Sequence, residues 1–505
     1  MRRKPFLNVL LLLLLSIIAN AQTTQPRLDS FFSSLYAYKE INGNVLVAEN
    51  GQTIYEKSFG YADFANKTAH SEHSQFILAS VSKVFTSAAV LQLRDKGILK
   101  LDDPVTKYFP GFPYPDITIR HLLSHTSGLP DYQLYEDLIT KNPQKIFSNQ
   151  DLFPALKIWK QPLTNKPGEK WNYSNNNFIL LALLVEKLSR MPFEKYIQKN
   201  IFKVSGMNDT YFLNDPVHTA DKRKATGYDY PLFISAELKE VDSIRKYRWI
   251  VYNASGFTGQ GGIVTTARDM LQFDKALYAG KILKPSSLQE AFTPAKLNNG
   301  ENADADIGIG KASYGLGWFI FSDSTNGKIV WHGGGRPGSV SFFLRNITKK
   351  QTVILFDNAF NKSLYANAVN ALAILNNNPV QFHKKSLVRE YNSTLAEKGV
   401  DAAFCRMQEL QVDSIHYFLS EDDMNELGLQ LLYAGKSPAH NEWALEVLKL
   451  NILLFPKSFN TYDSYGEALS NTNHKQEAIF MYKKSIELNP ANEQGKKALS
   501  ELMKK

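Results

Sequence analysis

The chain has 505 residues, 44% of them hydrophobic, and a formal net charge of +9 at pH 7. Its single cysteine, Cys405, excludes an intrachain disulfide framework and a thiolate-rich zinc or iron–sulfur site. The basic residues form no stripe with interleaved aromatics, so we expect no nucleic-acid partner. A chain of this length and apolar content is expected to form two or three domains around a large core.

Residues 1–21 have the pattern of a secretory signal peptide. Basic residues at positions 2–4 precede an apolar run over residues 6–18, and small residues at positions 19 and 21 predict cleavage before Gln22. The apolar run, about 13 residues long, is too short to cross a hydrocarbon core of roughly 30 Å. We therefore expect an exported protein, periplasmic or secreted, with no stable transmembrane segment after signal cleavage.

Strand-like runs open and close the segment from residue 22 to residue 376. The early runs, 43–48 and 53–59, are joined by a polar loop with Asn50-Gly51, a pair that favours a hairpin. Later runs cover residues 318–321, 329–331, 340–344 and 352–356, and the middle is mostly helical and rich in loops. This distribution predicts an α+β fold in which helices flank an antiparallel β-sheet.

After residue 376 the strand signals end, and helical periodicity with many charges takes over. We expect a helical linker over residues 377–425 and tetratricopeptide-like (TPR-like) helical repeats over residues 426–505. The later repeat carries Tyr462, Gly466, Ala478, Tyr482, Ser485 and Pro490, and a weaker copy carries Gly428, Ala444, Leu448 and Pro456. Such repeats predict a surface for a possible protein partner.

Ser80-Val81-Ser82-Lys83 stands at the predicted start of a helix that ends at Gly97. Residues three apart on a helix share a face, so the Ser80 hydroxyl and the Lys83 amine are expected within hydrogen-bond reach. A serine hydroxyl needs a base to become a good nucleophile, and a lysine whose pKa is depressed by burial can supply a neutral amine. The helix N-terminus would add backbone N–H groups where an oxyanion develops.

Two further motifs have residue types that suit the same chemistry. Tyr173-Ser174-Asn175 precedes a long apolar helix, so its tyrosine either projects into a cleft or packs beneath that helix. The run 332–338, His-Gly-Gly-Gly-Arg-Pro-Gly, lies between two predicted strands. Glycine there lets a strand edge approach a substrate carbonyl, with backbone N–H groups available as an oxyanion hole.

Metal and cofactor chemistry find little support. His121 and His125 are four residues apart, but no third ligand accompanies them, so helix packing or a helix cap is favoured. Gly333, Gly335 and Gly338 match a dinucleotide-binding pattern, but a strand rather than a helix follows them. We therefore predict no metal site and no cofactor.

Together these motifs resemble the class C-like serine hydrolases of the β-lactamase and penicillin-binding-protein superfamily. The resemblance covers residues 28–376 and includes the longer segments 117–129, 206–210 and 261–269. It implies a β-lactamase/transpeptidase-like fold, in which an antiparallel sheet flanked by helices is joined by an all-helical domain.

The resemblance also implies three sets of site residues. The catalytic set is Ser80, the nucleophile, with Lys83 and Tyr173 for proton transfer. The substrate-binding set is Asn175, His332, Gly333, Gly334 and Arg336. The oxyanion hole is formed by the backbone N–H groups of Ser80 and Gly335.

The sequence departs from the family where Lys-Thr-Gly is usual. His332 and Gly333 remove the hydroxyl and the fixed charge that recognise a substrate carboxylate, and Arg336 is a candidate replacement for the cation. We expect a small-molecule or peptide substrate: an ester, an amide or a D-amino-acid peptide, with a β-lactam open but less favoured. The alternative is an envelope scaffold with a weakly active or inactive hydrolase domain and a protein-binding helical tail.

Overall fold

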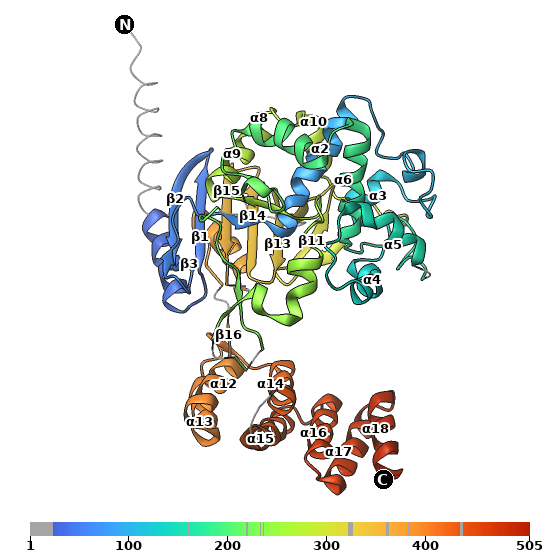
Figure 1. Cartoon of the computed structure of the whole chain (residues 1–505). Helices are drawn as coiled ribbons and strands as arrows, with labels where there is room; N and C mark the ends of the chain where they lie inside the picture. The colour runs from blue at the N-terminus through green and yellow to red at the C-terminus, as the bar shows by residue number, and fades with distance from the viewer. Residues whose placement is uncertain are drawn as a thin grey trace. The chain divides into compact units, whose positions relative to one another are not determined.

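The computed structural model describes residues 24–504 except 160, 219–220, 233, 236, 322–326, 360–362, 382–383 and 435–437. The predicted signal peptide lies outside the described residues. The chain divides into two compact units, the first of Met1–Asp229 and Glu240–Gln381, the second of Tyr230–Lys239 and Phe382–Lys505 (Figure 1). The predicted boundaries at residues 376 and 425 stay predictions.

The first unit is built on an eight-stranded sheet of order β10-β11-β12-β13-β14-β15-β1-β2, in which every neighbouring pair is antiparallel. Its strands are β1 (Gly43–Glu49), β2 (Gln52–Phe59), β10 (Asp304–Asp306), β11 (Lys311–Tyr314), β12 (Phe319–Phe321), β13 (Ile329–Arg336), β14 (Ser339–Asn346) and β15 (Gln351–Asp357). Asn50 and Gly51 have φ of 52° and 74° at the β1–β2 turn. The predicted hairpin is confirmed, because a tight turn between twisted strands favours two left-handed residues.

The central strands are buried on both faces, which explains their continuous apolar runs. Every residue of β14 and β15 is buried. Phe343 and Ile354 belong to the larger core, which also contains the helices α2 (Lys83–Asp95) and α9 (Ala267–Tyr278). Neighbouring side chains on the opposite face pack against α11 (Leu364–Leu375) and a helix over residues 24–37. The predicted α+β fold is confirmed.

The larger core is covered by a helix-rich region inserted between β2 and β10 (Figure 1). Its other helices are α3 (Ile119–Leu123), α4 (Glu136–Lys141), α5 (Leu152–Ile158), α6 (Asn175–Ser189), α7 (Phe193–Ile197), α8 (Lys203–Ser205) and α10 (Pro285–Ala291). Short strands accompany them: β3 (Tyr61–Asp63), β4 (Thr68–Ala69), β5 (Phe76–Ile77), β6 (Tyr211–Phe212), β7 (Tyr228–Asp229), β8 (Lys239–Glu240) and β9 (Ile263–Thr265). β5, β9 and β6 form a small sheet, and β5 leads through a short turn into α2, the helix that carries Lys83.

In the second unit, the described residues after Gln381 are mostly helical and include the paired short strands β16 (Lys385–Ser386) and β17 (Tyr417–Phe418). Its helices are α12 (Leu387–Lys398), α13 (Val400–Gln411), α14 (Glu421–Ala434), α15 (Pro438–Leu454), α16 (Phe459–Asn471), α17 (Lys475–Leu488) and α18 (Glu493–Lys504). A β-carbon on Gly428 would lie 2.4 Å from Leu448, so that glycine lets α14 and α15 pack closely. The predicted C-terminal helical region is confirmed, whereas its assignment to TPR repeats stays a prediction.

Within the part of the chain that the structure describes, no helix combines the length and the hydropathy needed to span a membrane.

Candidate active site

Ser80 lies on a short turn that connects β5 to α2. A 3-10 turn over Ala79–Ser82 is closed by the Val81 N–H donating to the Leu78 carbonyl at 3.1 Å, and it runs directly into α2. Ala79 has a φ of 44°, a left-handed conformation that is costly for a residue with a side chain. Such strained backbone is concentrated at functional sites. The turn leaves Ser80 half-buried beside a cavity.

Lys83 is fully buried and points back to Ser80. Its Nζ donates to Ser80 Oγ at 3.0 Å, to Asn175 Oδ1 at 2.8 Å and to the Gln260 carbonyl at 2.9 Å. These three acceptors use all three donors of an ammonium group. When Lys83 is neutral, its lone pair replaces one of the donors, and the Ser80 hydroxyl is the one partner that can reverse its hydrogen bond and donate.

The pKa of Lys83 suits a base that acts near neutral pH. Burial lowers it from the ordinary value to about 7, and the nearby negative charge of Asp131 opposes that shift. Asp131 also accepts hydrogen bonds from the Asn175 backbone N–H at 2.8 Å and from Asn175 Nδ2 at 3.1 Å. Asp131 therefore orients the amide of Asn175 so that its oxygen faces Lys83.

Tyr173 is the third member of this group. Its ring centroid lies 4.8 Å from Lys83 Nζ, and its hydroxyl is hydrogen-bonded to Ser80. Burial raises the pKa of Tyr173 well above its usual range, so the phenol stays protonated at neutral pH. Of the two orientations that the sequence left open, the tyrosine faces the serine.

His125 packs against the ring of Tyr173. Its ring stacks on the Tyr173 ring with centroids 4.1 Å apart, and its Nδ1 faces the Ser174 N–H at 3.2 Å and Asn177 Nδ2 at 3.0 Å. Both neighbours are donors, so Nδ1 is the unprotonated nitrogen of a neutral ring. Burial and the charge on Lys83 hold the pKa of His125 well below its usual range.

His121 has a separate, structural role. Its Nδ1 accepts the Thr118 N–H at 3.2 Å while the Thr118 hydroxyl accepts the His121 N–H at 3.2 Å, which caps α3. Among the described residues, no group of three or more His, Cys, Asp or Glu side chains is arranged to hold a metal ion.

The glycine-rich run forms the end of β13, where that strand has an open edge. Among the described residues, β12 pairs with β13 only at Val330 and Trp331, so β13 has no β12 partner from His332 onward. A β-carbon on Gly334 would lie 2.1 Å from the Leu78 carbonyl oxygen and 2.9 Å from the Ser80 nitrogen. Glycine at this position is therefore what allows β13 to approach the Ala79–Ser82 turn.

The substrate-binding residues predicted on β13 fall into two groups. His332 is buried, with Nδ1 2.7 Å from the Gly333 carbonyl and Nε2 3.1 Å from the Tyr314 hydroxyl. Burial lowers the pKa of His332 to about 3, so the ring is neutral and carries no cation to a substrate. Gly335 and Arg336 line the cavity beside Ser80, whereas His332, Gly333 and Gly334 are not among its lining residues.

The cavity beside Ser80 has a volume of about 80 Å³ and a mixed polar and apolar wall. Asn175 and Gln260, both bound to Lys83, contribute polar groups. The remaining wall is Ile77, Ala79, Tyr132, Leu213, Ile250, Ala254, Ser255, Phe257, Gly261 and Gly262. A second cavity of about 380 Å³ shares Ile77, Leu213, Ser255 and Arg336 with the first.

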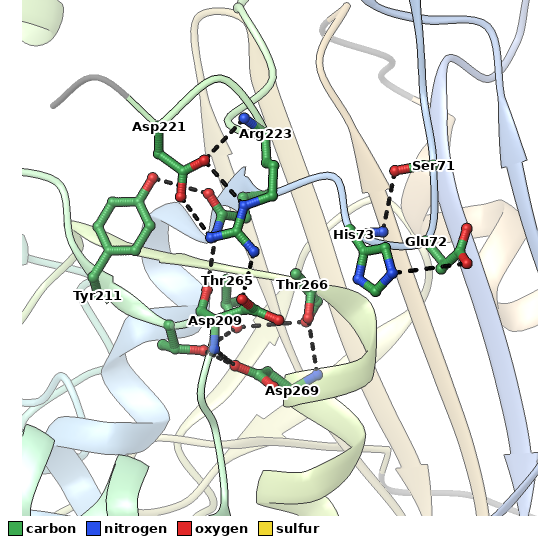
Figure 2. Close-up of polar contacts among 12 residues, drawn as sticks. Ser71, Glu72, His73, Asp209, Tyr211, Asp221, Arg223, Thr265, Thr266 and Asp269 are labelled. Carbon is green, nitrogen blue, oxygen red and sulfur yellow. Dashed lines mark hydrogen bonds and ion pairs between the residues drawn. The ribbon is translucent and has the colours of Figure 1, made fainter. Parts of the chain in front are cut away.

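A cluster of polar side chains joins the segment around Asp209 to the start of α9 (Figure 2). Asp269, at the start of α9, accepts the Asp209 N–H at 2.8 Å and the Thr210 hydroxyl at 2.7 Å. Arg223 forms an ion pair with Asp209 at 2.5 Å. The segments 206–210 and 261–269, which the sequence resemblance singled out, are thus joined to each other.

Comparison with known proteins agrees with this geometry. The Beta-lactamase family model matches residues 28–375. A penicillin-binding protein of Bacillus subtilis (strain 168) is 36% identical over 349 residues, which cover 69% of this chain and 75% of the relative. The crystal structure of a penicillin-binding protein from Bacillus halodurans superposes with a TM-score of 0.57 at 26% identity, covering 68% of this chain and 99% of that protein.

The D-amino acid amidase of Ochrobactrum anthropi SV3 has the same fold, with a TM-score of 0.57 at 22% identity over 70% of this chain and 99% of the amidase. The family match covers all eight strands of the large sheet and ends at Leu375, the last residue of α11. Because the match spans well over half of the sequence and one relative exceeds 30% identity, the chain belongs to the beta-lactamase family of serine hydrolases.

Proposed function

We propose that the protein hydrolyses an ester or amide bond through an acyl-enzyme on Ser80. The observation that carries this proposal is the hydrogen bond of 3.0 Å between Lys83 Nζ and Ser80 Oγ, made by a lysine that is fully buried. Burial favours the neutral amine, and a neutral amine at that distance can accept the hydroxyl proton.

Acylation requires three proton transfers. As Ser80 Oγ attacks the acyl carbon, its proton moves to the neutral Lys83 amine. Tyr173, which stays protonated because its pKa is raised, gives its proton to the leaving oxygen or nitrogen and regains one from Lys83. Hydrolysis of the acyl-enzyme runs in reverse order, with water in the place of the leaving group and Ser80 released as the free hydroxyl.

The tetrahedral oxyanion needs donors that are fixed before the reaction begins. The backbone N–H of Ser80 and that of Gly335 are the proposed pair, because both residues line one cavity and Gly334 allows their segments to meet closely. Donors of this type in acyl-transfer enzymes contribute roughly 3–4 kcal/mol each to transition-state stabilisation.

The proposed substrates are small esters, amides and D-amino-acid peptides. The names of the relatives, penicillin-binding protein and D-amino acid amidase, agree with amide-type substrates. A β-lactam is less favoured, because a neutral, buried histidine stands where the family has a lysine. We further propose that the protein is exported after cleavage before Gln22, which N-terminal sequencing of the mature protein would test.

Labelling with a fluorophosphonate probe tests the catalytic proposal. The wild-type protein is expected to be labelled on Ser80, and Ser80→Ala is expected to abolish the label. Ser82→Ala is a matched control, because Ser82 lies on the same turn but is buried and has no proposed part in the chemistry. Undiminished labelling of Ser80→Ala would overturn the proposal.

The second candidate function is a scaffold whose helical tail binds a protein. The separate compact unit formed by Phe382–Lys505 with Tyr230–Lys239 supports it. If this is the main function, Ser80→Ala should leave the protein's cellular role intact, whereas removal of residues 421–505 should abolish it. The opposite pattern would favour the hydrolase.

A further inference from the structure

Arg336 is a cation without a protein partner at the edge of the proposed active site. It ends β13, is half-buried and lines both the cavity beside Ser80 and the larger second cavity. Within the described ranges of the chain its guanidinium makes no ion pair, and its Nε is buried without a hydrogen-bond partner. A desolvated, unpaired guanidinium is unfavourable, and the natural way to relieve it is an anion.

The neighbouring protein groups do not satisfy this need. Asp242 is near enough to oppose the lowering of the Arg336 pKa that burial causes, but it is exposed and forms no ion pair with Arg336. Tyr132, which lines the cavity beside Ser80, is a neutral phenol whose pKa is raised well above its usual range by burial. The guanidinium has five N–H donors, and those on its two terminal nitrogens are open to a ligand that enters the cavities.

The position of Arg336 also indicates which part of a substrate it would meet. In the proposed mechanism the leaving group must lie next to Tyr173, and Tyr173 lines neither cavity. The cavities instead continue from Ser80 and Gly335 to Arg336, so they receive the part of the substrate that stays on the serine. Their volumes, about 80 Å³ and about 380 Å³, leave room for a chain of several atoms.

We propose that the acyl part of the substrate carries a carboxylate, which Arg336 binds where the two cavities meet. This inference rests on the proposed acyl-enzyme function and specifies its substrate class: esters or amides of a dicarboxylic acid or of an acidic amino acid. A planar guanidinium binds a carboxylate through two parallel hydrogen bonds, which gives direction as well as affinity. The neutral His332 contributes no charge to this recognition.

A matched pair of chromogenic esters tests the proposal. The 4-nitrophenyl monoester of adipic acid carries a free carboxylate on its acyl chain, and 4-nitrophenyl hexanoate is its neutral counterpart. Wild type is expected to hydrolyse the adipate with the higher kcat/KM. Arg336→Gln is expected to lower kcat/KM for the adipate about 10- to 100-fold, the usual range for a lost charge-assisted hydrogen bond, while the hexanoate changes by less than about threefold.

Asp242→Asn is the control for general charge effects. It removes a negative charge from the wall of the second cavity, so the preference for adipate should rise or stay the same. Equal losses for both esters in Arg336→Gln, or a wild-type preference for hexanoate, would overturn the proposal. Fluorophosphonate labelling of both proteins separates this inference from the proposed function. Ser80 should be labelled in wild type and in Arg336→Gln, and absence of labelling in wild type would refute the acyl-enzyme itself.

Discussion

The buried amine of Lys83 predicts a pH profile that can be calculated from the site. With a pKa of about 7, about half of the lysine side chains are neutral at pH 7. With the ordinary pKa of 10.5, only about one in 3,000 would be neutral, so burial raises the amount of available base by a factor of about 1,500. Because the neutral amine is the active form, the acylation rate should rise with pH and level off above pH 7.

The assay is the second-order rate of Ser80 labelling by a slow fluorophosphonate between pH 5 and pH 9. Below pH 7 the rate should fall about tenfold per pH unit. Asp131→Asn removes the negative charge that raises the pKa of Lys83, so the midpoint should move to lower pH by about one unit. A rate that climbs without a break to pH 9, or a midpoint that moves upward in Asp131→Asn, would refute the assignment of Lys83 as the base.

Three further predictions test the packing around the site and in the helical unit. His125→Phe keeps an aromatic ring on Tyr173 but leaves the Ser174 N–H without its acceptor, so kcat should fall about 10- to 100-fold while KM changes little; an unchanged kcat in steady-state kinetics would refute this role. Gly334→Ala puts a β-carbon 2.1 Å from a backbone oxygen and should abolish labelling, whereas Gly335→Ala, whose β-carbon meets nothing closer than 4.0 Å, should be milder; equal labelling rates would contradict this. Gly428→Val should make residues 421–504 sensitive to limited proteolysis, and an unchanged digestion pattern would count against the tight α14–α15 contact.

The features that short stretches of sequence determine were predictable. The Ser80–Lys83 pair depends only on a spacing of three residues at a helix start, and the geometry of 3.0 Å follows from it. The β1–β2 hairpin likewise depends on one Asn-Gly pair, whose two positive φ angles are a local property. The alternation of strands and helices was sufficient for the fold class, because each element has its own periodicity.

The contacts that tune the site were not predictable, because they join distant segments. Gln260 reaches Lys83 through the pairing of β5 with β9, in which Ile77 lies opposite Val264. Asp131 acts on Lys83 partly through Asn175, and nothing in the sequence indicates that the two meet. For His125 the sequence favours helix packing or a helix cap. Its ring does pack against Phe178 of α6, but the residue has a φ of 55° beyond the end of α3 and also stacks on Tyr173, which the spacing does not indicate.

The role expected of His332 depended on its burial. A histidine at an edge strand next to glycines is expected to face a substrate, but β13 is buried up to Gly334 and becomes exposed only at Gly335. The Tyr314 hydroxyl and the Gly333 carbonyl then occupy both ring nitrogens of the histidine. Which residue of the run reaches the cavity depends on where the strand emerges, and the order of residues alone does not indicate that point.

The most direct test of the central claim is mass spectrometry of the acid-quenched reaction with an ester substrate. The Ser80 peptide should gain the mass of the acyl group in wild type. Ser80→Ala should show no acylated peptide under the same conditions. An acyl group found on another residue, or substrate turnover in Ser80→Ala at the wild-type rate, would contradict the assignment of Ser80 as the nucleophile.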